Sequence, residues 1–153
     1  MKLNVPYFRQ EKSTTCGVAC LRMILSFNGI AESESELEYK CDTSWLGNTC
    51  EELAECVKEF NCNAEVFENM AESHLIGFLE KGQPIIVLVD PAVIYGGLQG
   101  FGHFIVVHGY DDDFFHYHDP DLSGDLIIRK KLFAEAWARQ AAKGIKVWTS
   151  MKK

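Results

Sequence analysis

The chain has 153 residues, 47% of them hydrophobic, and a formal net charge of -7. This length allows one substantial core but not two, so we expect a single domain over residues 1–153. The negative charge argues against a nucleic-acid partner, because binding phosphates requires clustered Lys and Arg side chains. No apolar run reaches the length of a membrane span, and residues 1–10 lack the apolar stretch of a signal peptide. We therefore expect no membrane segment and a cytoplasmic location.

The first predicted element is an amphipathic helix that opens at Cys16. From Gly17 to Phe27 the apolar residues recur at helical spacing, and Asn28-Gly29 supplies a stop signal. Thr14 and Thr15 are candidate N-terminal caps. The pattern places Cys16 in the first turn, where backbone N–H groups have no partner within the helix.

The remaining elements predict an α+β order, with most helices before an antiparallel sheet. Helices are predicted at Ser35–Lys40, Glu51–Phe60 with Thr49 as cap, Ser73–Lys81 and Leu132–Gln140; strands are predicted at Asn63–Phe67, Pro84–Val89, His103–Tyr110, Phe114–His118, Leu126–Arg129 and Lys146–Thr149. In this arrangement the Cys16 helix packs against the C-terminal antiparallel sheet.

Two loops are candidates for bordering a substrate groove. The segment Tyr95–Gly102 contains four glycines immediately before His103. It leads into a strand and not into a helix N-terminus, so we expect a mobile flap beside a site, or a plain surface loop, rather than a phosphate cradle. For Trp45 a partly buried packing role is favoured over a place at the border of the groove.

The chemistry of the thiol directs attention to Cys16 and His103. A free thiol has a pKa of about 8.5, and a helix N-terminus or a nearby imidazolium favours the thiolate. His103 opens an apolar strand far from Cys16 in sequence and is the candidate general base. Gly17 is expected to allow close approach of a substrate backbone to the nucleophile.

A carboxylate is required to hold the imidazole in the correct tautomer, and Asp119 is best placed to do so. It ends an aromatic run that pairs with the His103 strand through the acidic turn Asp111–Asp113, which returns Asp119 toward His103. The developing oxyanion also needs donors, for which the Cys16 N–H and the Gln10 side-chain amide are the natural pair.

The cysteine and histidine spacings favour neither disulfides nor a metal site. Six cysteines occur without secretory context and are expected to be free: Cys16, Cys20, Cys41, Cys50, Cys56 and Cys62. For Cys20 a buried core position is favoured over a disulfide with Cys16. A metal site formed by His103, His116 or His118 with Asp119 is the weaker alternative, so we expect no metal and no cofactor.

Three strings now carry a family resemblance: QEKSTTCGVACLRMIL, GHFIVVHGY and HDP, in this order. From about Val5 to the C-terminal strand, the chain resembles the papain-like peptidases that remove double-glycine leaders from bacteriocins and related peptides. The resemblance implies a papain-like fold with Cys16 as nucleophile, His103 as general base, Asp119 as orienting residue and Gln10 as oxyanion donor. Such peptidases are commonly fused to exporters. This chain carries no exporter portion, so an exporter partner, if the chain has one, is expected to be a separate protein.

The leading hypothesis is a cysteine peptidase that hydrolyses a peptide bond through a Cys-His-Asp triad. The resemblance implies cleavage after Gly-Gly or other small residues in a leader-type peptide. A second hypothesis keeps the triad in a papain-like deamidase or acyltransferase. A third is a domain that binds peptides without cutting them.

Overall fold

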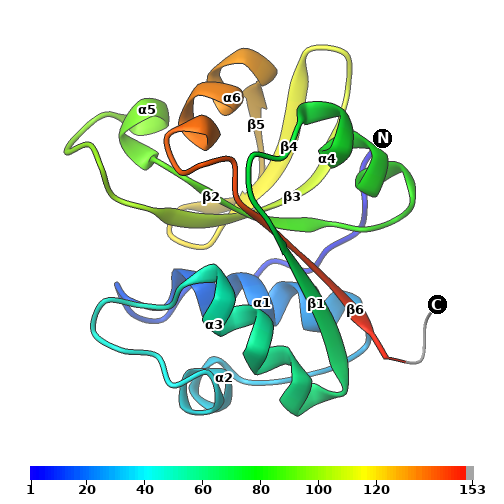
Figure 1. The fold of residues 1–153 in the computed structure, drawn as a ribbon, viewed down its shortest axis with the longest axis vertical. Helices are drawn as coiled ribbons and strands as arrows, with labels where there is room; N and C mark the ends of the chain where they lie inside the picture. Colours follow the sequence, from blue (N-terminus) through cyan, green and yellow to red (C-terminus); the bar gives the residue numbers. More distant parts are fainter. Residues whose placement is uncertain (151–153) are drawn as a thin grey trace.

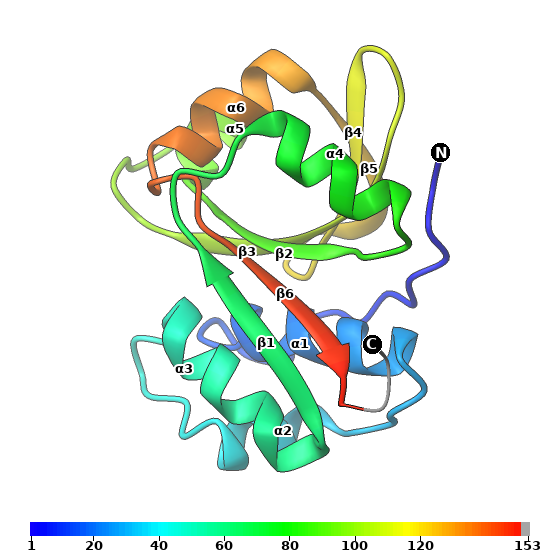
Figure 2. The ribbon, with the colours of Figure 1, turned by 45° about the vertical axis from the view of Figure 1, so that its right-hand side comes forward.

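The core of the fold is a six-stranded antiparallel sheet. The computed structural model describes residues 1–150. The strands are β1 (Cys62–Phe67), β2 (Ile85–Val89), β3 (His103–Tyr110), β4 (Phe114–Asp119), β5 (Ser123–Arg129) and β6 (Gly144–Thr149). Their spatial order is β1-β6-β2-β3-β4-β5. The C-terminal strand β6 therefore inserts between β1 and β2, and Figure 2 shows β1 and β6 side by side in green and red.

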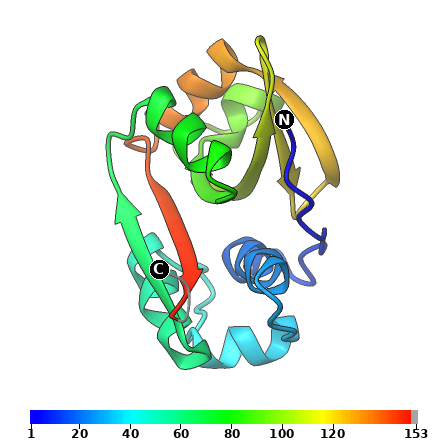
Figure 3. The same cartoon turned by 90° about the vertical axis from the view of Figure 1, so that its right-hand side faces the viewer.

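Helices cover both faces of this sheet. They are α1 (Cys16–Phe27), α2 (Glu34–Lys40), α3 (Cys50–Cys56), the 3₁₀ helix η1 (Val57–Phe60), α4 (Glu72–Glu80), α5 (Pro91–Tyr95) and α6 (Lys130–Ala138). Figures 1 and 3 show α1, α2 and α3 on one side and α4, α5 and α6 on the other. The predicted α+β class is confirmed. In the part of the chain that the structure describes, no helix has the length and apolarity needed to cross a membrane.

Alternation along β3 builds a hydrophobic cluster on each face of the sheet. Phe104 and Val106 join the cluster that contains the buried side chains of α1. Ile105 and Val107 belong to the other cluster, together with Phe133 of α6. Successive side chains of a strand point to opposite faces, so β3 is buried on both sides. This double burial fixes the strand whose first residue is His103.

Two helical segments differ from the prediction. The expected helix over residues 51–60 is α3 followed by η1, and Thr49 caps it as predicted, in a capping box with Glu52. The short α5 was not predicted. Asp90 caps it and Pro91 occupies its first turn, a combination typical of a helix start. Five residues are too few to produce a helical periodicity, which explains why the pattern did not reveal α5.

The expectation that all six cysteines are free is wrong for two of them. Cys41 and Cys56 form a disulfide with a Cα–Cα distance of 5.0 Å, while Cys16, Cys20, Cys50 and Cys62 are free. Cys41 terminates α2 and Cys56 is the last residue of α3. The packing of these two helix ends brings the sulfurs together, whereas the prediction rested on the redox compartment alone. Cys20 is fully buried in the core, as favoured.

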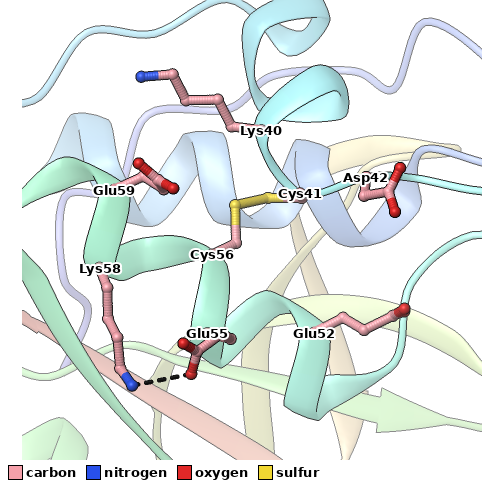
Figure 4. A pocket seen from close by; sticks show the side chains of 8 residues that line it. All are labelled: Lys40, Cys41, Asp42, Glu52, Glu55, Cys56, Lys58 and Glu59. Carbon is pink, nitrogen blue, oxygen red and sulfur yellow. Dashed lines mark hydrogen bonds and ion pairs between the residues drawn. A yellow bond between two sulfur atoms is a disulfide. The ribbon is translucent and has the colours of Figure 1, made fainter.

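The disulfide lies in a charged hollow away from Cys16. Figure 4 shows the hollow, of about 480 Å³, between the end of α2 and the helix α3 with its continuation η1. Its other lining residues are Lys40, Asp42, Glu52, Glu55, Lys58 and Glu59. It shares no residue with the cleft that Cys16 lines. Lys58 pairs with Glu55 there, and both cysteines of the hollow are held in the disulfide, so it offers no free thiol.

Candidate active site

The thiol of Cys16 lies at the first residue of α1, as predicted. The preceding Thr15 occupies the N-cap position, but its side chain does not cap the helix. Its hydroxyl instead donates to the Lys12 carbonyl at 2.9 Å and accepts the Lys12 N–H at 3.0 Å. The capping role expected of Thr15 is therefore wrong. Without a side-chain acceptor in the first turn, the partial positive charge of the helix start remains directed toward the thiol.

Gly17 has a different role from the expected one. A Cβ there would lie 3.1 Å from Leu53 Cδ1 and 3.2 Å from Phe104 Cδ2. The absent side chain thus lets α1 pack closely against α3 and β3. It does not provide room for a substrate.

His103 and Asp119 are brought together by the β3–β4 hairpin. The His103 Nε2 and Asp119 Oδ1 atoms are 2.7 Å apart. Because a carboxylate only accepts hydrogen bonds, Nε2 carries the proton and donates it. The other ring nitrogen, Nδ1, is then the one available to Cys16, which lines the same cleft as His103. This is the tautomer that a thiol–imidazole pair requires.

The surroundings of the imidazole favour its charged form. Burial opposes the charge on His103, but hydrogen bonding to Asp119 and to Cys16 outweighs it and raises the pKa of His103 to about 10. Burial also opposes the charge on Asp119, yet the hydrogen bond from His103 and further donors keep its pKa below the usual value. His103 and Asp119 are therefore an ion pair at neutral pH, as expected for two oppositely charged groups that share a hydrogen bond.

Asp119 has further partners that sequence reasoning did not identify. Its Oδ1 atom accepts the Asp121 N–H at 2.9 Å, and its Oδ2 atom accepts the hydroxyl of Tyr95 at 2.8 Å. The hydroxyl of Tyr7 donates to its main-chain carbonyl at 2.7 Å. Tyr95 is the last residue of α5, and this helix was not predicted, so Tyr95 was not placed beside Asp119. The sequence signal that could have indicated α5 is Asp90-Pro91, which is typical of a helix start.

Gln10 lies next to the end of β4, but no hydrogen bond joins it to Cys16. Its backbone N–H donates to the Pro120 carbonyl at 2.8 Å, and its side-chain Nε2 donates to the Lys12 carbonyl at 2.8 Å. The Oε1 atom is buried without a hydrogen-bond partner. Because an amide nitrogen carries two hydrogens, one N–H of Gln10 remains free to donate.

The cleft in front of Cys16 and His103 has a volume of about 510 Å³. The loop from Trp45 to Thr49 contributes to its lining, as do Gly102, Gln140 and Lys143. Trp45 is 81% exposed, so the favoured packing role is wrong and the tryptophan borders the cleft. The glycine-rich segment before His103 also carries exposed apolar side chains, Leu98 and Phe101. The apolar lining of the cleft itself, which includes Trp45, Leu46 and Leu88, is suited to binding a peptide.

The metal grouping considered from the sequence does not assemble. His103 pairs with Asp119, His116 with Asp111, and His118 with the Val5 carbonyl and the Asp125 N–H. Among the described residues, His108, His118 and Asp125 do lie close enough to hold an ion. Both nitrogens of His118 are already hydrogen-bonded, however, so it has no lone pair free for a metal.

Comparison with known proteins places the chain in a family. A model described as the Peptidase_C39-like family matches residues 2–146. The chain belongs to the peptidase C39-like family. The resemblance seen in the sequence is thereby confirmed. No curated protein matches the sequence of this C39-like chain.

Three solved structures show the same fold. A protein from Bacillus anthracis solved as a C39-like peptidase has a TM-score of 0.81 at 18% identity, covering 99% of this chain and 100% of its own. The peptidase domain of Streptococcus ComA has a TM-score of 0.78 at 21% identity, covering 95% and 99%. A double-glycine-motif protease from an AMS/PCAT transporter, in complex with a leader peptide, has a TM-score of 0.73 at 19% identity, covering 95% and 92%. The C39-like chain therefore has the papain-like α+β fold of C39 peptidases, and its family supports peptidase activity.

Proposed function

We propose that this C39-like protein is a cysteine peptidase that acts through Cys16, His103 and Asp119. The observation that carries the proposal is geometric: Cys16 and His103 line one cleft, and the buried Asp119 carboxylate fixes the imidazole at 2.7 Å. A nucleophile, a base within reach of it and a group that orients the base are the parts that thiol catalysis requires.

The reaction follows from these positions. His103 Nδ1 holds the proton taken from the thiol, and the Cys16 thiolate attacks the peptide carbonyl to form a C–S bond. The oxyanion accepts hydrogen bonds from the Cys16 N–H and the free N–H of Gln10. The imidazolium then protonates the leaving amine as the C–N bond breaks. In the second half, His103 deprotonates a water molecule that releases the acyl group from the sulfur.

The proposed substrate is a leader-type peptide cut after Gly-Gly or other small residues. Support comes from the leader peptide bound to the AMS/PCAT protease and from the transporter context of that protein and of ComA. By the same relationships, the proposed partner is an exporter that carries the released peptide.

The first test needs no substrate. The alkylation rate of Cys16 by iodoacetamide is measured against pH by peptide-resolved mass spectrometry. His103→Ala should remove the fast reaction near neutral pH, because the imidazolium that stabilises the thiolate is lost. His116→Ala is the matched control, since His116 pairs with Asp111 on the hairpin. A rate that is unchanged in His103→Ala would refute the triad and favour a peptide-binding domain.

A second experiment identifies the reaction. Peptides and peptide amides that contain Gly-Gly are incubated with the wild type and with Cys16→Ala, and the products are weighed by mass spectrometry. Cleavage that depends on Cys16 supports the peptidase. A mass gain of about one dalton without cleavage indicates deamidation, and an added amine indicates acyl transfer.

A further inference from the structure

The second oxygen of the Asp119 carboxylate has its own donor, and this donor lies outside the triad. Oδ1 receives both the His103 Nε2–H and the Asp121 N–H, whereas Oδ2 receives the Tyr95 hydroxyl at 2.8 Å. The Asp119 side chain is 1% exposed, so solvent cannot replace a missing donor. A buried carboxylate oxygen without a donor is costly, which makes the Tyr95 hydroxyl important for keeping Asp119 ionised.

The direction of the hydrogen bonds follows from the chemistry. The hydroxyls of Tyr95 and Tyr117 are 2.8 Å apart, and either oxygen is a competent donor. Because the Asp119 carboxylate only accepts, the Tyr95 hydroxyl donates its hydrogen bond to Oδ2, and the Tyr117 hydroxyl therefore donates to the Tyr95 oxygen. Burial and these hydrogen bonds raise the pKa of Tyr95 well above its usual value. The phenol thus stays protonated, and remains a donor, across the working pH range.

The element that presents Tyr95 is itself anchored. Tyr95 is the last residue of α5, and the buried carboxylate of Asp90 caps this helix by accepting the Ala92 N–H at 3.0 Å. The other oxygen of Asp90 accepts the Gly100 N–H at 3.0 Å. Gln99 in the same segment accepts from Arg139. The glycine-rich segment is thus tied at two points beyond Tyr95, and the hydroxyl is held at a fixed place beside the carboxylate.

We propose that Tyr95 is a positioning residue of this peptidase: its hydroxyl holds the free oxygen of Asp119, which in turn holds the His103 ring toward Cys16. This inference rests on the proposed function, because it assigns Tyr95 a role in the same triad. Tyr95 does not touch the reacting atoms. It acts through Asp119, by keeping the carboxylate ionised and in one orientation.

The test uses Tyr95→Phe, which keeps the ring and removes the hydroxyl. Oδ2 then lacks a donor, so Asp119 takes up a proton at higher pH and His103 loses its anionic partner. The acid limb of the Cys16 alkylation rate against pH should therefore move upward. The limb should move by about one pH unit, the order expected for the loss of one hydrogen bond to a charged group, so that at a given pH on the limb the rate falls about tenfold. If a peptide substrate is found, kcat should fall in parallel while KM changes little.

Tyr117→Phe is the matched control, because it makes the same chemical change one hydrogen bond away from the carboxylate. It should leave the acid limb near its wild-type position. Thermal unfolding of both variants separates stability from positioning. If the role of the Tyr95 hydroxyl is merely structural, Tyr95→Phe should have a lower melting temperature but an unmoved acid limb of the alkylation rate. Coincident limbs in Tyr95→Phe and the wild type would overturn the proposal.

Two further variants keep the outcomes distinct. If His103→Ala and Asp119→Asn suppress alkylation and Tyr95→Phe does not, the role of Tyr95 is refuted and the proposed function stands. If His103→Ala leaves alkylation unchanged, no triad exists and the role of Tyr95 is refuted with it.

Discussion

The disulfide between Cys41 and Cys56 offers the most direct test of the fold. Its cysteines are 15 residues apart. In the chain-entropy treatment, closing a loop of 15 residues lowers the conformational entropy of the unfolded chain and so raises its free energy by about 3 kcal/mol at 25 °C. Cys41→Ala/Cys56→Ala should therefore lower the free energy of unfolding by about 3 kcal/mol. For a chain of this size, such a loss corresponds to a fall of roughly 6–12 °C in the melting temperature.

The assay compares thermal unfolding of the wild type and the double variant with and without a reductant. Reduction should bring the wild type close to the variant and leave the variant unchanged. Alkylation of the unfolded, unreduced wild type should label four cysteines, against six after reduction. Cys50→Ala/Cys62→Ala is the control, since it removes two buried free thiols and should keep the sensitivity to reductant. Six labelled cysteines without reduction, or equal melting temperatures, would refute the reasoning.

Three further predictions concern stability. The pKa of His103 is raised to about 10. The protonated imidazole therefore stabilises the folded chain in full below about pH 6.5, and this stabilisation is lost as the pH rises through 10. The free energy of unfolding of His103→Gln should not show this loss. His108 is fully buried beside His118, Asp125 and Lys2, and burial lowers its pKa to about 4. Between pH 6.5 and 4 the His108 imidazole binds a proton in the unfolded chain but not in the folded one. The free energy of unfolding should therefore fall by about 3 kcal/mol over this range. In urea titrations, His108→Leu should abolish this pH dependence. In Gly109→Ala the new Cβ would lie 2.6 Å from the Met1 carbonyl oxygen. Displacement of the N-terminus should lower the free energy of unfolding by about 1–3 kcal/mol and speed hydrogen exchange at the Tyr110 amide, which donates to that carbonyl. Unchanged exchange would contradict the contact.

The elements with long hydrophobic patterns were the ones that could be predicted from the sequence. Long periodic runs such as residues 16–27 and 103–110 gave their helix and strand at the correct positions. The acidic turn between β3 and β4 was enough to pair these strands. The order of the strands in the sheet could not be predicted, because β6 reaches its place between β1 and β2 through pairs that are 57 to 87 residues apart in sequence. The disulfide was missed for a similar reason, since it depends on how two helix ends meet.

Residues 7–10 connect the two halves of the site in a way that no local pattern reveals. The Tyr7 hydroxyl donates to the Asp119 carbonyl, the Gln10 N–H to the Pro120 carbonyl at 2.8 Å and the Arg9 guanidinium to the Asp121 carbonyl at 2.9 Å. The same segment leads within six residues to Cys16. The nucleophile and the carboxylate that orients its base therefore belong to segments joined by three hydrogen bonds. Because each bond joins positions more than 100 residues apart in sequence, motifs alone could suggest the residues of the site, while their relative placement required the folded chain.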